Sequence, residues 1–180
     1  YVSIEPEHFT KNTGAGESRW IKIEDYGRTL SGMRATGPAN APALVPGKNS
    51  PCLEYKMYLF NVKTTEVVAV TSPVLNFMPG RGIHYAVSFD DEPPQIVTLV
   101  PPNYNAQTGN RDWENAVQNN SRVSRSAHAI EKPGYHTLKF WMIDPGVVLQ
   151  KIVVNTGGVK PSYLGPPESF FNSTLTNREH

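Results

Sequence analysis

The chain has 180 residues, with 17 Lys and Arg against 16 Asp and Glu, so its formal net charge is +1. This balance gives no electrostatic reason to expect nucleic acid or an anionic membrane as a partner. No apolar run approaches the roughly 20 residues that a membrane-spanning helix needs, and the length suits one domain with a buried core.

Glycine and proline separate a series of short apolar runs along the chain, which favours an all-β architecture over helices. Residues 52–60 and 83–90 alternate with the period of two that places every second side chain on one face of a strand. Residues 67–71 and 96–100 are apolar on both faces, so we expect them at the centre of a sheet or beneath loops. In chain order, the expected strands are Tyr1–Glu5, Trp20–Asp25, Arg28–Arg34, Cys52–Phe60, Val67–Thr71, Ile83–Asp90, Ile96–Val100, His136–Ile143 and Val147–Val154.

This pattern predicts a jelly-roll β-sandwich of two antiparallel sheets, with both ends of the chain in the sheets. One helix is expected at Asp112–Asn119, with Asp112 as its cap and an inward stripe of Trp113, Ala116 and Val117. We expect the sandwich to span residues 1–169, followed by a C-terminal tail at 170–180. A tight turn at residues 144–146 should join the last two strands.

The chain carries no motif of a known catalytic centre, such as a nucleophile elbow, a zinc-binding helix or a phosphate loop. The single Cys52 has no cationic neighbour in sequence and is expected to be a buried structural thiol. The acidic run at 90–92 could supply paired carboxylates, but carboxylates adjacent in sequence rarely face each other across a substrate. A solvated turn is the better interpretation, and we expect the domain not to be an enzyme by itself.

The N-terminal segment is the place where a metal ion is plausible. Glu5 and Glu7 are two residues apart and share one face of an extended chain. Two such carboxylates can contribute hard oxygen ligands to a structural Ca²⁺ if backbone carbonyls complete the shell. The alternative is a pair of edge-strand carboxylates that discourage pairing with other chains.

Carbohydrate binding would need an exposed aromatic face beside polar groups that contact sugar hydroxyls. An arginine there would also suit a uronate carboxylate. Trp20 and Trp113 could equally fill the core of the sandwich. The candidates, all near expected turns, are Trp20, Tyr26, Arg28, Tyr104 and Trp113.

The segment after the last strand contains an apolar, conformationally stiff strip. Its members are expected to pack against another domain or a second subunit. They are Tyr163, Leu164, Pro166 and Pro167.

The sequence resembles the C-terminal domain of glycoside hydrolase family 115, the xylan α-1,2-glucuronidases. The motifs that carry the resemblance follow one another over almost the whole chain, and the last two are the most specific. They are YVSIEPEHF at 1–9, WIKIEDYGRT at 20–29, SPCLEYKMYLF at 50–60, SPVLNF at 72–77, YAVSFD at 85–90, FWMIDPGVVLQKIV at 140–153 and GGVKPSYLGPPES at 157–169.

The resemblance implies a non-catalytic domain of a larger bacterial enzyme that removes glucuronic acid side chains from xylan outside the cytoplasm, in the extracellular space or the periplasm. Its expected partners are the upstream catalytic domains and, as an additional ligand, xylan or glucuronoxylan. The N-terminus is also similar to carbohydrate-binding module families 6 and 35, in which this strand helps to hold a structural calcium. In this chain the acidic residue that closes that site is replaced by Gln150.

Two functions therefore remain open. The domain is either an assembly domain of its enzyme or a stand-alone carbohydrate-binding module for glucuronoxylan or another plant polysaccharide, and one sandwich can do both.

Overall fold

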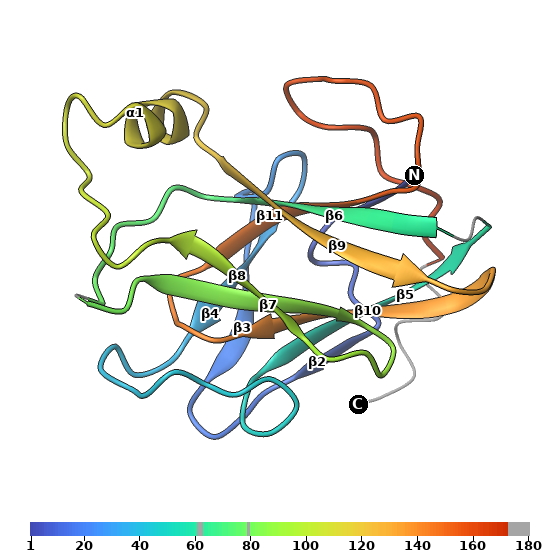
Figure 1. The fold of residues 1–180 in the computed structure, drawn as a ribbon, viewed down its shortest axis with the longest axis horizontal. Helices are drawn as coiled ribbons and strands as arrows, with labels where there is room; N and C mark the ends of the chain where they lie inside the picture. Colours follow the sequence, from blue (N-terminus) through green and yellow to red (C-terminus); the bar gives the residue numbers. More distant parts are fainter. Residues whose placement is uncertain (61–62, 79, 173–180) are drawn as a thin grey trace.

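Two antiparallel sheets pack face to face in the computed structural model of the chain (Figure 1). The structure describes all residues except 61–62, 79 and 173–180. Sheet A has the order β3-β4-β11-β6-β9, with β1 also paired to β11, and sheet B has the order β2-β5-β10-β7-β8. The predicted all-β jelly-roll sandwich is confirmed. Sheet A consists of β1 (Val2–Ile4), β3 (Arg19–Ile23), β4 (Gly32–Thr36), β6 (Lys63–Thr71), β9 (Arg122–Ile130) and β11 (Val148–Asn155). Sheet B consists of β2 (Lys11–Thr13), β5 (Cys52–Leu59), β7 (Ile83–Phe89), β8 (Gln95–Val100) and β10 (Gly134–Met142).

The core lies between the sheets and is built from the alternating side chains that the sequence predicts. In sheet B, Leu53 pairs with Phe140 and Tyr55 pairs with Leu138, and all four side chains are buried. Tyr85 stacks on Phe140 at a ring-centroid distance of 4.5 Å. Full burial of each such side chain contributes about 1.5–3 kcal/mol relative to exposure. These contacts join β5, β10 and β7, the three central strands of sheet B.

A β-bulge in β11 changes which side chains face the core. Leu149 and Ile152 both belong to the core although they are three positions apart, and the pairing with β6 shifts register between Leu149 and Lys151. Because side chains alternate along a strand, the extra residue leaves Gln150 and Lys151 directed away from the core. Both are nevertheless buried, so other segments must cover this outer side of sheet A.

Two expectations about individual strands were wrong. The predicted strand Arg28–Arg34 begins only at Gly32. Arg28 and Thr29 lie in the loop before it, because their side chains form hydrogen bonds with segments that are distant in sequence. The run 96–100 is not central: β8 forms the edge of sheet B, and Ile96 is 67% exposed. By contrast, β6 lies between β11 and β9, as its two apolar faces predicted.

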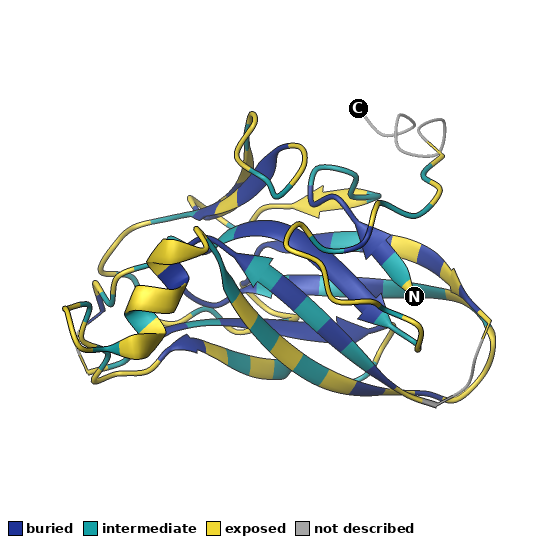
Figure 2. Cartoon of the chain, turned by 90° about the horizontal axis from the view of Figure 1, so that it is seen from above, coloured by how far each residue is buried: buried dark blue, intermediate teal, exposed yellow. Residues whose placement is uncertain are grey.

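The helix α1 (Arg111–Gln118) begins one residue earlier than expected and has a different cap. The side chain of Asn110, not Asp112, accepts hydrogen bonds from the first backbone N–H groups of the helix. Of the expected inward stripe only Ala116 is buried, and Val117 is exposed. Figure 2 shows that most of the helix is exposed. No helix among the described residues has the length and apolar character of a membrane span.

Candidate functional site

A polar pocket of about 540 Å³ opens where α1, the start of β9, the loop between β3 and β4, and the C-terminal segment 156–172 meet. Its walls come from parts of the chain that are far apart in sequence. Among the described residues, it is lined by Arg28, Thr98, Leu99, Asp112, Asn115, Ala116, Asn119, Ser121, Arg122, Val123, Ser124, Ser162 and Tyr163.

Arg28 holds one wall of the pocket together. Its guanidinium donates to the backbone carbonyl of Asn119 at 3.2 Å and to that of Tyr163 at 2.5 Å. It also lies over the Tyr163 ring, 4.7 Å from the centroid, and the Tyr163 hydroxyl donates to the same Asn119 carbonyl at 3.3 Å. The arginine therefore joins the β3–β4 loop, the end of α1 and the C-terminal segment.

Arg122, another lining residue, makes a similar arrangement. Its guanidinium lies 4.8 Å from the centroid of the Tyr104 ring, donates to the Tyr104 hydroxyl at 3.0 Å and pairs with Asp112. Partial burial raises the pKa of Tyr104 above its ordinary value, and the Arg122 charge acts in the opposite direction. The pocket lining thus includes two arginines, each paired with a tyrosine, and Asn115 is a further lining residue.

Hydroxyl groups of a sugar, or a uronate, match this mixture of amide, guanidinium and carboxylate groups. Of the five predicted carbohydrate-contacting residues, Arg28 lines the pocket and Tyr104 adjoins it through Arg122. Tyr26 is exposed and Trp113 is half-buried, and neither lines the pocket. Sequence reasoning missed Asp112, Asn115, Asn119 and Arg122, for which the only signal was the predicted helix that carries or precedes them.

The prediction that Trp20 contacts carbohydrate is corrected by its burial. Its side chain is 2% exposed, meets Phe140 edge-on at 5.6 Å and donates from Nε1 to the Pro51 carbonyl at 3.4 Å. The ring fills the space between the sheets, so no sugar face can reach it.

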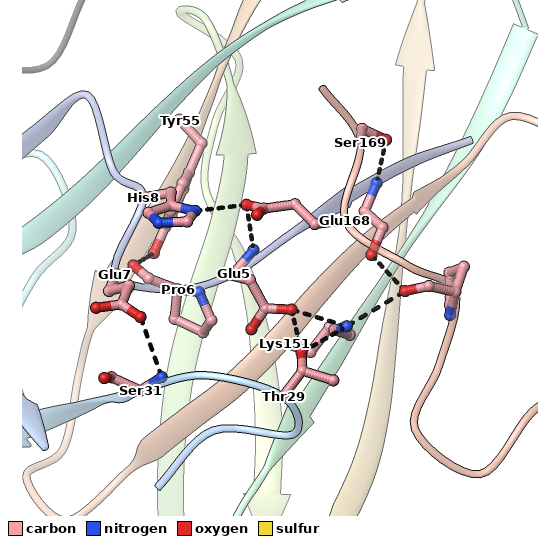
Figure 3. Close-up of polar contacts among 12 residues, drawn as sticks. Glu5, Pro6, Glu7, His8, Thr29, Ser31, Tyr55, Lys151, Glu168 and Ser169 are labelled. Atoms are coloured by element: carbon pink, nitrogen blue, oxygen red, sulfur yellow. Dashed lines mark hydrogen bonds and ion pairs between the residues drawn. The ribbon is translucent and has the colours of Figure 1, made fainter. Parts of the chain in front are cut away.

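The predicted metal ligands Glu5 and Glu7 are already engaged (Figure 3). Glu5 Oε1 lies 2.9 Å from the Lys151 ammonium and accepts a hydrogen bond from Thr29. Glu7 Oε1 accepts from the backbone N–H of Ser31 at 3.1 Å, and its Oε2 faces the ammonium of Lys22 at 3.3 Å.

These residues do not fit a calcium ion. Of the carboxylate oxygens of Glu5 and Glu7, Glu5 Oε2 is the one that is buried without a hydrogen-bond partner among the described residues. One such oxygen is too few for Ca²⁺, which takes about six to eight oxygen ligands. A divalent cation there would also lie beside the ammonium of Lys151. No group of three or more His, Cys, Asp or Glu side chains among the described residues could hold a metal ion.

The C-terminal segment 156–172 is held against the N-terminal strand by polar contacts. Ser3 and Ser169 exchange hydrogen bonds, and the Glu168 carboxylate accepts from His8 Nδ1 at 2.6 Å. Phe171, at the start of the expected tail, stacks on His8 with a centroid distance of 4.0 Å. Residues 173–180 of that tail lie outside the described residues.

The predicted apolar strip on this segment is only partly exposed. Pro166 is buried, and its carbonyl accepts from Ser3 Oγ and from Lys151 Nζ, so its assignment to an interdomain or subunit interface is corrected. Pro167 is exposed. Tyr163 is 67% and Leu164 47% exposed, and the neighbouring Phe170 is 95% exposed.

A separate aromatic cluster lies on the outer face of sheet B. The Tyr58 ring meets Tyr135 edge-on at 5.2 Å and Phe60 at 4.7 Å, and the ammonium of Lys56 lies 5.3 Å from the Tyr135 centroid. All three aromatic side chains are exposed. Because the rings are not coplanar, they form an angular surface rather than a flat platform.

Comparisons with known proteins agree on the fold. A domain of a family 115 4-O-methyl-α-glucuronidase with specificity for decorated arabinogalactans superposes with a TM-score of 0.58 and 14% identity, over 83% of this chain and 18% of that one. The family 35 carbohydrate-binding module from Clostridium thermocellum gives 0.53 and 16%, over 84% of this chain and 96% of the module. An exo-β-1,3-galactanase from Phanerochaete chrysosporium gives 0.52 and 13%, over 85% and 29%.

No curated protein sequence matches the chain. The sequence model of the glycosyl hydrolase family 115 C-terminal domain, however, matches residues 1–168, which is nearly the whole described sandwich. The chain belongs to the family of C-terminal domains of glycosyl hydrolase family 115.

Proposed function

We propose that this chain is the non-catalytic accessory domain of a xylan α-1,2-glucuronidase that acts in the extracellular space or the periplasm, and that it contributes to assembly of that enzyme. The supporting observation is the C-terminal segment. It is fixed to β1 by polar contacts, yet it presents Tyr163, Leu164 and Phe170 to solvent. Large exposed apolar side chains on a rigid support are typical of a docking surface. The partners are the upstream catalytic domains or a second subunit.

The test is a double variant, Leu164→Ser with Phe170→Ser, in the complete enzyme. Tyr163 is left in place because it also supports Arg28. We expect a lower assembly mass by size exclusion with light scattering, or faster proteolysis between domains. The matched control is Leu75→Ser with Ile96→Ser, two exposed apolar residues elsewhere. Unchanged mass and unchanged proteolysis of the test variant would contradict an assembly role.

A second function, binding of glucuronoxylan or a related polysaccharide, is supported by the pocket. Its two arginine–tyrosine pairs and its amide groups offer stacking faces beside hydrogen-bond donors. Calorimetric titration of the 180-residue chain with glucuronoxylan and with arabinogalactan tests binding directly.

Three variants locate the binding surface in that titration. Asn115→Ala changes the lining, and we expect it to weaken binding about tenfold or more, the cost of about one or two hydrogen bonds. Gln118→Ala is the control on the same helix, outside the lining. Tyr135→Ala removes an exposed ring of the aromatic cluster on sheet B, the one that contacts both Tyr58 and Lys56. If only Tyr135→Ala weakens binding, the pocket is not the site.

A further inference from the structure

The ammonium of Lys151 lies beside Glu5, one of the two residues that the sequence predicts as metal ligands. The β-bulge in β11 directs the lysine away from the core, and the C-terminal segment then covers it, so that the residue is 1% exposed. Gly165 passes close to the aliphatic stem: a Cβ at this position would lie 3.1 Å from the Lys151 Cδ atom.

Three oxygen atoms surround the Lys151 ammonium, and each comes from a different segment (Figure 3). Lys151 Nζ lies 2.9 Å from Glu5 Oε1 after β1, 3.2 Å from Thr29 Oγ1 in the β3–β4 loop, and 3.2 Å from the Pro166 carbonyl. The Glu5 carboxylate is 2% exposed and carries the matching negative charge. A buried ion pair needs several supporting contacts, because both charges have lost their hydration. Here Glu5 Oε1 has Lys151 and Thr29 as partners, whereas Glu5 Oε2 is buried without one.

We propose that Lys151 replaces a structural metal ion in this domain. One ammonium neutralises the buried carboxylate and ties β1, the β3–β4 loop and the C-terminal segment to β11. These are the tasks that a bound divalent cation would perform between the same oxygens. Folding of the domain is therefore independent of Ca²⁺ and of chelators, and the cross-link is built into the sequence.

The first experiment needs no variant. Thermal unfolding of the 180-residue chain is followed after dialysis against EDTA and again in millimolar CaCl₂, with NaCl added to equal ionic strength. We expect the two melting temperatures to agree to within about 1 °C, since the Glu5–Lys151 pair leaves no site at which Ca²⁺ would bind the folded state selectively. A melting temperature that rises with the CaCl₂ concentration would overturn the proposal.

The second experiment removes the ammonium. Lys151→Met should lower the melting temperature by roughly 10 °C, because it leaves Glu5 buried and uncompensated. Adding Glu5→Gln to this variant removes the orphaned charge and should recover most of the loss. The matched control is Lys22→Met, which removes a half-exposed lysine that also contacts two carboxylates and should change the melting temperature by only about 2 °C or less.

If Lys151→Met is too unstable to purify, the double variant Lys151→Met with Glu5→Gln is tested alone. The proposal requires that this double variant folds, because it buries no uncompensated charge. A Lys151→Met variant as stable as the parent chain, or a double variant no more stable than Lys151→Met, would overturn the assigned role.

Discussion

The Cys52 thiol shows how burial sets the chemistry of one residue. The side chain is buried in β5, and this burial, reinforced by the nearby Glu54 charge, raises the pKa of Cys52 to about 12. Only about one thiol in 10,000 is then ionised at pH 8, and the thiolate is the reactive form. We expect no measurable reaction of the native chain with an aromatic disulfide reagent within an hour at pH 8, and full reaction of the single cysteine in guanidinium. Rapid labelling without denaturant would contradict this burial.

His136 makes a pH-dependent contact at the same scale. Its Nδ1 lies 2.7 Å from the Asp90 carboxylate and its Nε2 lies 2.9 Å from the Lys132 carbonyl, so both ring nitrogens face acceptors. Partial burial lowers the pKa of His136, but the hydrogen bonds to Asp90 and Lys132 outweigh it and raise the pKa above 6.5.

A histidine whose pKa is raised by folding stabilises the protein below its unfolded pKa, and the contribution is lost as the pH rises through the folded pKa. His136→Gln should therefore lower the free energy of unfolding by about 0.5–1 kcal/mol at pH 5.5 and by much less at pH 9. Denaturant titrations at the two pH values measure this difference. An equal loss at both would show that the charge of the imidazolium has no part in it.

At the scale of elements, α1 depends on its cap because it buries only Ala116. Asn110 Oδ1 accepts from the backbone N–H groups of Asp112 and Trp113. Asn110→Ala should cost about 1 kcal/mol of helix stability and open the pocket wall, because Asn115 and Asn119 lie on and after this helix. Hydrogen exchange of the α1 amides should accelerate roughly fivefold. Asn103→Ala, in the exposed preceding loop, is the control and should leave that exchange unchanged.

The turn between β10 and β11 requires glycine at position 146. Its φ is +87°, and an added Cβ would lie 2.7 Å from the Phe77 ring. Gly146→Ala should therefore destabilise the chain by about 2–3 kcal/mol, from the strained backbone and the displaced ring together. Gly134→Ala is the matched control: its φ is also positive, but nothing lies within 4 Å of the added atom. Similar melting temperatures for the two variants would show that the Phe77 contact is unimportant.

The success of sequence reasoning differed between elements for a physical reason. Strands such as β5 and β7 were predicted because their inward side chains are apolar and face a continuous core. β9 was missed because its inward positions, apart from Ile130, are polar. Ser124 bonds to the Tyr85 hydroxyl, and His128 bonds to Ser126, so the strand satisfies its inner face with hydrogen bonds and shows no apolar alternation. β2 is short and wholly exposed, so it carries no pattern at all.

For the whole molecule, the same limit explains the candidate site. Arg28 was chosen for its residue type, but its partner Tyr163 is 135 positions away, and only the folded sandwich brings them together. The bulge that turns Lys151 outward likewise has no local sequence signal. Composition and periodicity therefore predict the layers of this domain, whereas contacts between remote loops, which form the pocket and the buried ion pair, follow from the tertiary structure.

The two sheets are held together partly by Trp20, which lies on β3 of sheet A and contacts Phe140 on β10 of sheet B. Trp20→Ala should lower the free energy of unfolding by about 3–5 kcal/mol, the range for removing a buried aromatic side chain. Polysaccharide affinity, measured well below the melting temperature, should stay unchanged because the ring does not line the pocket. Tyr26→Ala, an exposed aromatic change close by in sequence, should alter stability by at most about 0.5 kcal/mol. Loss of affinity in Trp20→Ala at unchanged stability would instead place this ring at a ligand, and the packing of the two sheets would then have to rest on other side chains.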